Sequence, residues 1–191
     1  MNDNDTRSRA AEDLSIVVRD STAGDMPTIQ QIYSFYVVNS LATFEESPPS
    51  ADELLRSRDV ILAAGLPHLV ATVNHKVAGY AYASSYRLRP AYRYTVEDSV
   101  YVLPGLQSKG IGTALLSSLI ARCELGAWRQ MIAVIGDSAN AGSVALHRRL
   151  GFEQMGILKA VGFKLGQWVD TVLMQRSLGR GARTRPQIKS G

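Results

Sequence analysis

Cysteine is almost absent from this sequence. The 191 residues include one, Cys123, so the chain cannot form an internal disulfide, which favours a reducing compartment. Cys123 falls on the apolar face of a predicted helix, and no charged residue is obviously placed to activate its thiol. We therefore expect a buried, unreactive thiol rather than a nucleophile.

Histidine is scarce as well. The three histidines, His68, His75 and His147, do not cluster with one another or with cysteine. Metal sites built from such side chains need several ligands at characteristic spacings. The sequence therefore predicts no metal cofactor, and His75 is expected to be a solvated turn residue.

Long apolar runs are missing too. The best candidate, from Val60 to Val73, is interrupted by Gly65, Pro67 and His68 and cannot cross a bilayer as a helix. No apolar signal sequence opens the chain. We expect a cytoplasmic protein without a membrane partner.

The formal net charge of +4 is concentrated at one end of the chain. Residues 179–191 contain four basic residues and no acidic one, which equals the whole net charge. We expect disordered tails at 1–13 and 179–191 around a single domain at 14–178. A nucleic-acid-binding arm is the alternative for the basic tail, but no aromatic residues are interleaved with its charges. We therefore expect no nucleic-acid partner.

The remaining sequence alternates between strand-like and helix-like patterns. Helices are predicted from apolar periodicity and capping signals at 26–40, 51–64, 111–125 and 141–150. Strands are predicted at 16–19, 69–73, 77–86, 95–103, 130–135, 152–159 and 168–178. A hairpin in the middle and parallel pairing around the central unit predict an α/β (α+β) fold with one mixed sheet.

The stretch from Thr95 to Leu125 is the centre of this pattern. A Val-, Thr- and Tyr-rich strand ends at Pro104-Gly105 and passes through a loop containing Gly110 and Gly112 into an apolar helix. The first turn of a helix has unpaired backbone N–H groups and the positive end of the helix dipole, so it is suited to phosphate. Glycines would let a bulky anion approach the backbone.

Two motifs resemble those of the GNAT acyl-CoA N-acyltransferases: Gln107-x-x-Gly110-x-Gly112 after the strand, and a second that runs Asn140-x-x-Ser143-x-x-Leu146-His147-x-x-Leu150-Gly151-Phe152. The block Thr95-Val-Glu-Asp-Ser-Val-Tyr-Val102 and the run from Gly162 to Asp170 resemble, more narrowly, the phosphinothricin and methionine sulfoximine N-acetyltransferases. The resemblance covers about Ile16 to Leu178 and implies a splayed pair of central strands.

The resemblance implies acetyl-CoA as co-substrate. The strand backbone at Val100, Tyr101 and Val102 would pair with the pantetheine arm like an added strand, and a backbone N–H there would stabilise the oxyanion. The pyrophosphate would lie on the loop residues Ser108, Lys109, Gly110, Ile111, Gly112 and Thr113. Asn140 and Ser143 would contact the cofactor, although a helix cap is an alternative role for Asn140.

Glu97 is the candidate general base. An attacking amine must be neutral, and an α-amino group is partly protonated near neutral pH. Glu97 lies on the strand that leads to the cofactor, and by strand alternation its neighbour Asp98 should point to the opposite face. Partial burial would raise the pKa of the carboxylate into a useful range. The alternative is a surface glutamate on an edge strand.

Further site residues follow from the resemblance. His147 occupies the position where many members of the superfamily have a tyrosine that protonates the departing thiolate, and a structural role is an equal alternative. The acceptor would contact Phe44 and Glu45 after the first helix, and Arg89 and Tyr92 before the central strand. Arg89 could bind a carboxylate or phosphinate through two hydrogen bonds, or be an ordinary loop residue.

The sequence thus predicts an enzyme that moves acetyl from acetyl-CoA to the α-amine of a small acidic amino-acid analogue by direct attack. Another amine, such as a polyamine, an antibiotic or a protein N-terminus, is an alternative acceptor. A CoA-binding module without turnover is an alternative of a different class. The branch resemblance also suggests a homodimer.

Overall fold

The computed structural model describes residues 15–186. Within them, the strands are β1 (Ile16–Asp20), β2 (His68–Val73), β3 (Lys76–Ser85), β4 (Thr95–Val102), β5 (Gln130–Gly136), β6 (Glu153–Lys164) and β7 (Gln167–Ser177). The helices are α1 (Met26–Asn39), α2 (Ala51–Ala63), α3 (Ile111–Glu124) and α4 (Ala141–Arg149), with 3-10 turns η1 (Ala23–Asp25), η2 (Pro90–Tyr92) and η3 (Gly181–Arg183).

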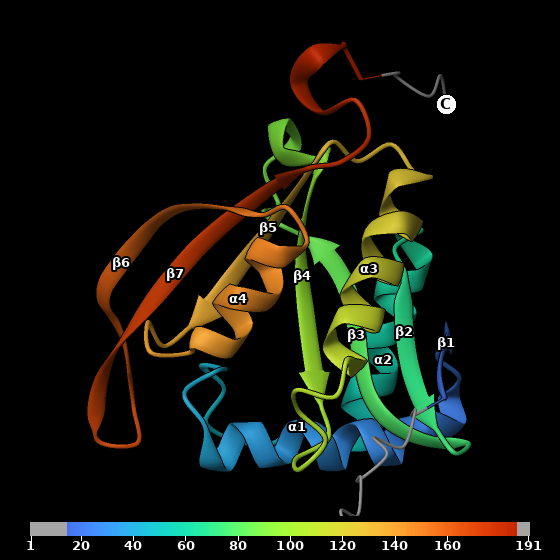
Figure 1. Cartoon of the computed structure of the whole chain (residues 1–191), viewed down its shortest axis with the longest axis vertical. Coiled ribbons are helices and arrows are strands. Elements are labelled where there is room, and N and C mark those ends of the chain that lie inside the picture. Colours follow the sequence, from blue (N-terminus) through green and yellow to red (C-terminus); the bar gives the residue numbers. More distant parts are fainter. Residues whose placement is uncertain (1–14, 187–191) are drawn as a thin grey trace, which may run out of the picture.

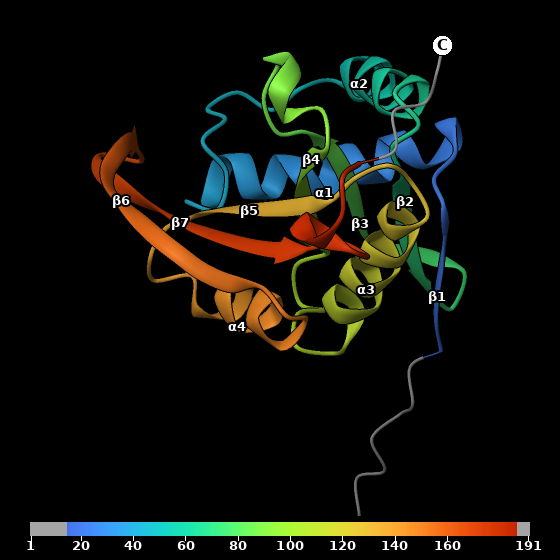
Figure 2. The ribbon, with the colours of Figure 1, turned by 90° about the horizontal axis from the view of Figure 1, so that it is seen from above.

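The strands form one mixed sheet in the order β1-β2-β3-β4-β5-β7-β6 (Figure 1). Its neighbouring strands are antiparallel except for β4 and β5, which run parallel. Helices α1 and α2 cover one face and α3 and α4 the other (Figure 2). The predicted fold class is confirmed, and β4 is the middle strand of the sheet rather than an edge strand.

Local signals in the sequence place the helix ends. The side chain of Ser50 accepts a hydrogen bond from the amide of Glu53, and Glu53 binds back to the Ser50 amide, which completes a capping box for α2. Pro27 lies in the first turn of α1, where its missing N–H costs nothing. Gly151 follows α4 with φ +84°, a left-handed conformation that ends a helix without steric strain.

The main core lies between the sheet and α3. Leu115, Leu116 and Leu119 are fully buried against Met131 and Met174 of β5 and β7. Each such side chain removed from water contributes about 1.5–3 kcal/mol. A second, smaller core joins α1 to the opposite face of the sheet. The two cores hold β4 from both sides, so the strand that carries the site is rigidly supported.

The sixth strand is longer than predicted, and the seventh is shifted by one residue from its predicted range. β6 continues to Lys164, and β7 begins at Gln167 after a two-residue turn in which Leu165 and Gly166 both have positive φ, the conformation that tight hairpins require. The predicted strand ended at 159, yet Gly162 pairs with Val169 inside the hairpin. β6 is the outer strand of the sheet, with no further strand beside it among the described residues.

The described chain also continues past the predicted domain boundary at 178. Gly181 is buried and donates its amide hydrogen to the carbonyl of Leu178, at the start of η3. The guanidinium of Arg129 contacts the carbonyl of Arg185. The expected N-terminal tail at 1–13 and the last part of the expected basic tail, 187–191, lie outside the described residues.

Candidate functional site

The parallel strands β4 and β5 separate halfway along β4. Their pairing runs from Thr95↔Gln130 to Asp98↔Ala133 and stops there, while β4 continues to Val102. Figure 1 shows the two strands together at one end and diverging toward the other. A cavity of about 700 Å³ fills this wedge, lined by β4, β5, α1, α4 and the loop before α3. The volume falls in the range of small-molecule sites.

The glycine loop lies at the open end of the wedge. Gly110 has φ +86° and occupies the N-cap position of α3, where no side chain caps the helix. The first amides of α3 are therefore left for a ligand. Of the predicted loop residues, Ser108, Gly110, Gly112 and Thr113 line the cavity, and Gln107 lines it beside them.

The other two predicted loop residues have different surroundings. Lys109 is exposed and does not line the cavity. The side chain of Ile111 is buried in the main core, so only its backbone remains as a possible contact.

The free edge of β4 forms one wall of the cavity. Val100, Tyr101 and Val102 all line it, and no β5 residue pairs with them. The ring of Tyr101 packs edge-on against Tyr33, on the α1 side of the sheet. Tyr36 donates its hydroxyl hydrogen to the carbonyl of Val102 at 2.6 Å. This wall thus offers backbone groups to an extended ligand.

Helix α4 forms the opposite wall. The side chain of Asn140 accepts a hydrogen bond from the amide of Ser143 at 3.2 Å, so Asn140 is the helix cap that the sequence allowed. Asn140 and Ser143 also line the cavity, and the cap does not use the amide N–H₂ donors of Asn140. A cap and a ligand contact are compatible at this residue.

Glu97 and Asp98 point to opposite faces of β4, as strand alternation predicts. Burial, followed by the negative charge of Asp98, raises the pKa of Glu97 to about 7, against the opposing charge of Arg87. Asp98 is buried and lines the cavity, whereas Glu97 does not line it. A carboxyl group that titrates near pH 7 suits a general base.

His147 is held by two acceptors. Its Nδ1 lies 2.7 Å from the carbonyl oxygen of Ser143, and its Nε2 lies 3.0 Å from Oδ2 of Asp98. Burial alone would lower the pKa of His147, but the hydrogen bond and charge of Asp98 and the Ser143 carbonyl raise it above its usual value. A carbonyl oxygen and a carboxylate both accept hydrogen bonds, so these two contacts and the raised pKa favour the doubly protonated ring.

The loop between α1 and α2 closes the site on the Glu97 side of the sheet. The hydroxyl groups of Tyr33 and Thr43 are hydrogen-bonded at 3.0 Å. Lys164 of β6 is buried and donates from Nζ to the carbonyl oxygens of Ser40, at 2.8 Å, and Thr43, at 2.7 Å. A side chain at Gly162 would collide with the ring of Phe44. Strand β6 thus fixes the position of this loop.

The predicted acceptor residues are distributed over two loops. Phe44 and Glu45 are exposed on the α1–α2 loop. Arg89 is exposed at the start of η2, and Tyr92 packs edge-on against Tyr86. The arginine whose charge acts on Glu97 is Arg87, which also lies over the rings of Tyr86 and Tyr92.

Sequence reasoning missed three residues of this region, Tyr36, Arg87 and Lys164, and also the contact between Asp98 and His147. Alternation did place Asp98 on the face opposite Glu97, and Lys164 is part of the run that carried the narrower resemblance. Apolar periodicity placed Tyr36 on one face of the first predicted helix without giving it a site role, and no local pattern marked Arg87.

Two other groups can be placed with respect to the chemistry. Cys123 is buried in the main core, and burial raises the pKa of its thiol to about 12, so it is no nucleophile. Between residues 15 and 186, no three His, Cys, Asp or Glu side chains gather in a way that could hold a metal ion. Over the same residues, no helix is long and apolar enough to cross a membrane.

Comparison with known proteins gives a consistent result. Residues 29–152 match the family model described as the acetyltransferase (GNAT) family. The chain is 53% identical over 171 residues to a phosphinothricin N-acetyltransferase of Alcaligenes faecalis, a match that covers 90% of this chain and 85% of that protein. It is 39% identical over 166 residues to an L-methionine sulfoximine/L-methionine sulfone acetyltransferase of Pseudomonas paraeruginosa, covering 86% and 96%.

A solved structure shares the fold in detail. The crystal structure of a GNAT superfamily phosphinothricin acetyltransferase from Sinorhizobium meliloti in complex with AcCoA matches with a TM-score of 0.89 and 48% sequence identity. The match covers 92% of this chain and 95% of that one.

Proposed function

Because the chain belongs to the acetyltransferase (GNAT) family, we propose that it transfers the acetyl group of acetyl-CoA to the α-amine of a small amino-acid analogue of the phosphinothricin or methionine sulfoximine type. The observation that carries the proposal is the wedge between β4 and β5, with uncapped α3 amides at one end and the buried carboxyl group of Asp98 at the other. Relatives whose names state these substrates cover most of the chain.

The wedge suits acetyl-CoA from end to end. Its pyrophosphate would contact the amides of residues 108–113, where the helix dipole of α3 favours negative charge. Its pantetheine arm would run along Val102 and Val100, whose edge of β4 has no partner strand. The thioester would then lie near Asp98, where β4 and β5 meet.

The reaction is a direct transfer. Glu97 takes a proton from the acceptor ammonium, the neutral amine attacks the thioester carbon, and a backbone N–H of Tyr101 or Val102 stabilises the oxyanion. The carbon–sulfur bond then breaks and CoA leaves as a thiolate, while the nitrogen passes its remaining excess proton to solvent and becomes the neutral amide of the second product. The high pKa of Cys123 argues against an acyl-enzyme on that residue.

The acceptor would bind on the Glu97 side of β4. Phe44 and Glu45 on the α1–α2 loop would form one wall, and Arg89 and Tyr92 around η2 the other. The charge of Arg87 beside Glu97 makes it a further candidate for an acidic acceptor group. An α-carboxylate and a phosphinate or sulfoximine would each need such a donor.

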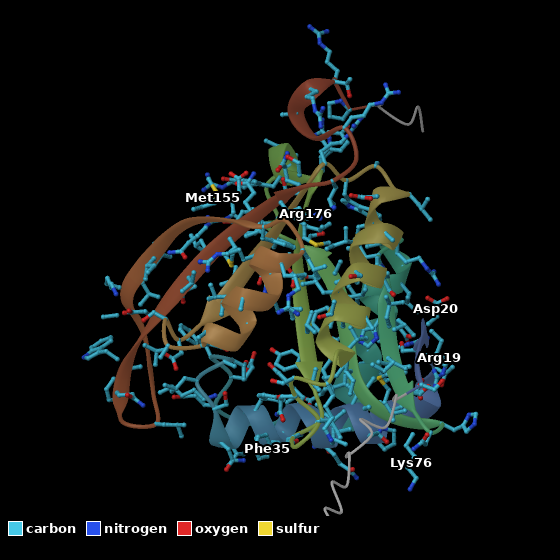
Figure 3. The ribbon with its side chains drawn as sticks, viewed as in Figure 1. Arg19, Asp20, Phe35, Lys76, Met155 and Arg176 are labelled. Carbon is cyan, nitrogen blue, oxygen red and sulfur yellow. The ribbon has the colours of Figure 1, made fainter. Side chains whose placement is uncertain are left out.

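We also propose that the chain forms a homodimer through the β6–β7 hairpin. The outer strand β6 exposes a band of apolar side chains that its own chain leaves uncovered, including Met155, Leu158, Val161 and Phe163, and β7 adds Trp168. Figure 3 shows Met155 on the surface of this hairpin. An exposed apolar patch on a sheet edge favours pairing with a second copy. The cytoplasm remains the proposed location, from the cysteine content.

Release of CoA thiol tests the proposal directly. The chain is mixed with acetyl-CoA and phosphinothricin, methionine sulfoximine or spermidine, and Glu97→Gln is run beside it. Rapid turnover on the first two acceptors that falls by about 10²–10⁴-fold in the variant supports substrate and base together. Turnover on spermidine alone would replace the proposed acceptor, and tight acetyl-CoA binding without any turnover would favour a binding module.

A further inference from the structure

A buried ion pair closes the narrow end of the wedge. Asp98 is the last residue of β4 that pairs with β5, and from there its side chain reaches His147 of α4. The side chains of Asp98 and His147 are 2% and 5% exposed, and both residues line the cavity. The pair therefore bridges the β4 wall and the α4 wall at the point where β4 and β5 begin to diverge.

Several contacts fix the His147 side of the pair. Its Nδ1 lies 2.7 Å from the Ser143 carbonyl oxygen, its Nε2 lies 3.0 Å from Asp98 Oδ2, and the ring of Phe152 packs edge-on against the imidazole at 5.0 Å between centroids. Removal of one member of a buried pair leaves the other charge uncompensated, so the pair resists displacement. Both ring nitrogens already have partners, so in this inference His147 acts through the volume it fills, and the acid role remains the alternative for it.

The direction of the bound donor follows from the two ends of the cavity. Phosphate-binding amides lie at the open end and Asp98 at the closed end, so the acyl group of a CoA thioester would point toward the pair. Acetyl adds one methyl group beyond the thioester carbonyl. Each further methylene of a longer acyl chain would extend toward the buried side chains of Asp98 and His147.

We propose that the Asp98–His147 pair is the floor of the acyl pocket and restricts the donor to a short acyl group. This inference rests on the proposed use of acetyl-CoA. It adds that Asp98 and His147 limit the length of the acyl group on the CoA donor. Pockets that discriminate one methylene by contact do so by roughly 10–200-fold. The preference arises from the volume that the pair fills.

Donor binding tests the floor without any acceptor. Dissociation constants of acetyl-CoA and butyryl-CoA are measured by titration calorimetry for the native chain, Asp98→Ser, Asp98→Asn and the matched surface variant Asp20→Ser. Asp20 is exposed on β1, away from the cavity. We expect the native chain to prefer acetyl-CoA by at least tenfold and Asp98→Ser to narrow that ratio by tenfold or more.

The two other variants distinguish the effect of lost side-chain volume at residue 98 from a general loss of structure. Asp98→Asn keeps the size of the side chain and can bond to neutral His147, so its ratio should stay within about threefold of native. Asp20→Ser should match the native ratio. Two results would contradict the proposed acyl-pocket floor. One is an equal loss of affinity for acetyl-CoA and butyryl-CoA in Asp98→Ser. The other is a preference for acetyl-CoA that falls as much in Asp98→Asn as in Asp98→Ser. Failure of the native chain to bind acetyl-CoA would remove the proposed function and this inference with it.

Discussion

Glu97 and Asp98 are adjacent on β4, and their carboxyl groups point to opposite faces of the sheet. The Glu97 carboxyl lies on the α1 face with its pKa raised to about 7, while Asp98 on the α3 and α4 face is bound to His147 at 3.0 Å. The negative charge of Asp98 is the second cause, after burial, of the raised Glu97 pKa. One β-strand thus keeps a titrating carboxyl on one face of the sheet, with its pKa raised in part by the carboxylate on the other face.

The pH dependence of turnover should report Glu97. With acetyl-CoA saturating, kcat/KM for the acceptor should rise with pH through a midpoint near 7, because only ionised Glu97 accepts a proton. A second rise at higher pH belongs to the acceptor amine itself. Steady-state profiles check this. In Glu97→Gln the limb near pH 7 should vanish while the amine limb remains; a limb unchanged in the variant would assign it to another group.

Ionisation of Glu97 should also lower the free energy of unfolding above neutral pH. A carboxyl whose pKa is raised in the folded state binds its proton more tightly there than in the unfolded chain, so stability falls as pH rises from about 4.5 to about 7. Thermal unfolding should show that Glu97→Gln gains more over the native chain at pH 8 than at pH 4.5. An equal gain at both values would mean that Glu97 titrates normally.

The α3 loop should tolerate no side chain at Gly110. Alanine at φ +86° costs about 1–2 kcal/mol and shifts the amides that face the cavity. We expect Gly110→Ala to raise the KM for acetyl-CoA at least severalfold with little change in the KM for the acceptor. Gly105→Ala is the matched control, because Gly105 has φ +85° but does not line the cavity. Equal KM values in the two variants would contradict a phosphate site at this loop.

Lys164 should act on the acceptor through the α1–α2 loop. Lys164→Met keeps most of the side-chain volume but leaves the carbonyls of Ser40 and Thr43 without their donor, at a cost of about 1–3 kcal/mol. The KM for the acceptor should rise while that for acetyl-CoA stays near native, as steady-state kinetics would show. Lys159→Met, on the exposed part of the same strand, should change stability by less than about 1 kcal/mol. A proportional rise in both KM values would indicate general unfolding.

The features that the sequence predicted correctly are those that depend on short-range interactions. The capping box at Ser50, the opposite directions of Glu97 and Asp98 and the strand-to-helix turn at Gly110 each depend on a few neighbouring residues. All three appear in the structure. The resemblance to the GNAT acyltransferases, based on two motifs, is confirmed by the family match.

The parts that the sequence did not predict depend on distant contacts. Lys164 and Thr43 are 121 positions apart, and His147 and Asp98 are 49 apart. No local period encodes such pairs. The extension of β6 through Gly162 is similar, because pairing with β7 and the Phe44 ring above it outweigh the low strand propensity of glycine. The roles assigned to the site residues remain predictions.

The hairpin should be the dimer interface. A stable interface buries more than about 1,000 Å² in total, and the apolar band on β6 is the surface best suited to that. Val161 is 52% exposed on β6, whereas Val60 is 70% exposed on α2, so Val161→Asp and Val60→Asp make the same change at two exposed sites. Sedimentation equilibrium should give a dimer for the native chain and for Val60→Asp, and a monomer for Val161→Asp. A native monomer at micromolar concentration, or a Val161→Asp variant that stays dimeric, would place any interface elsewhere.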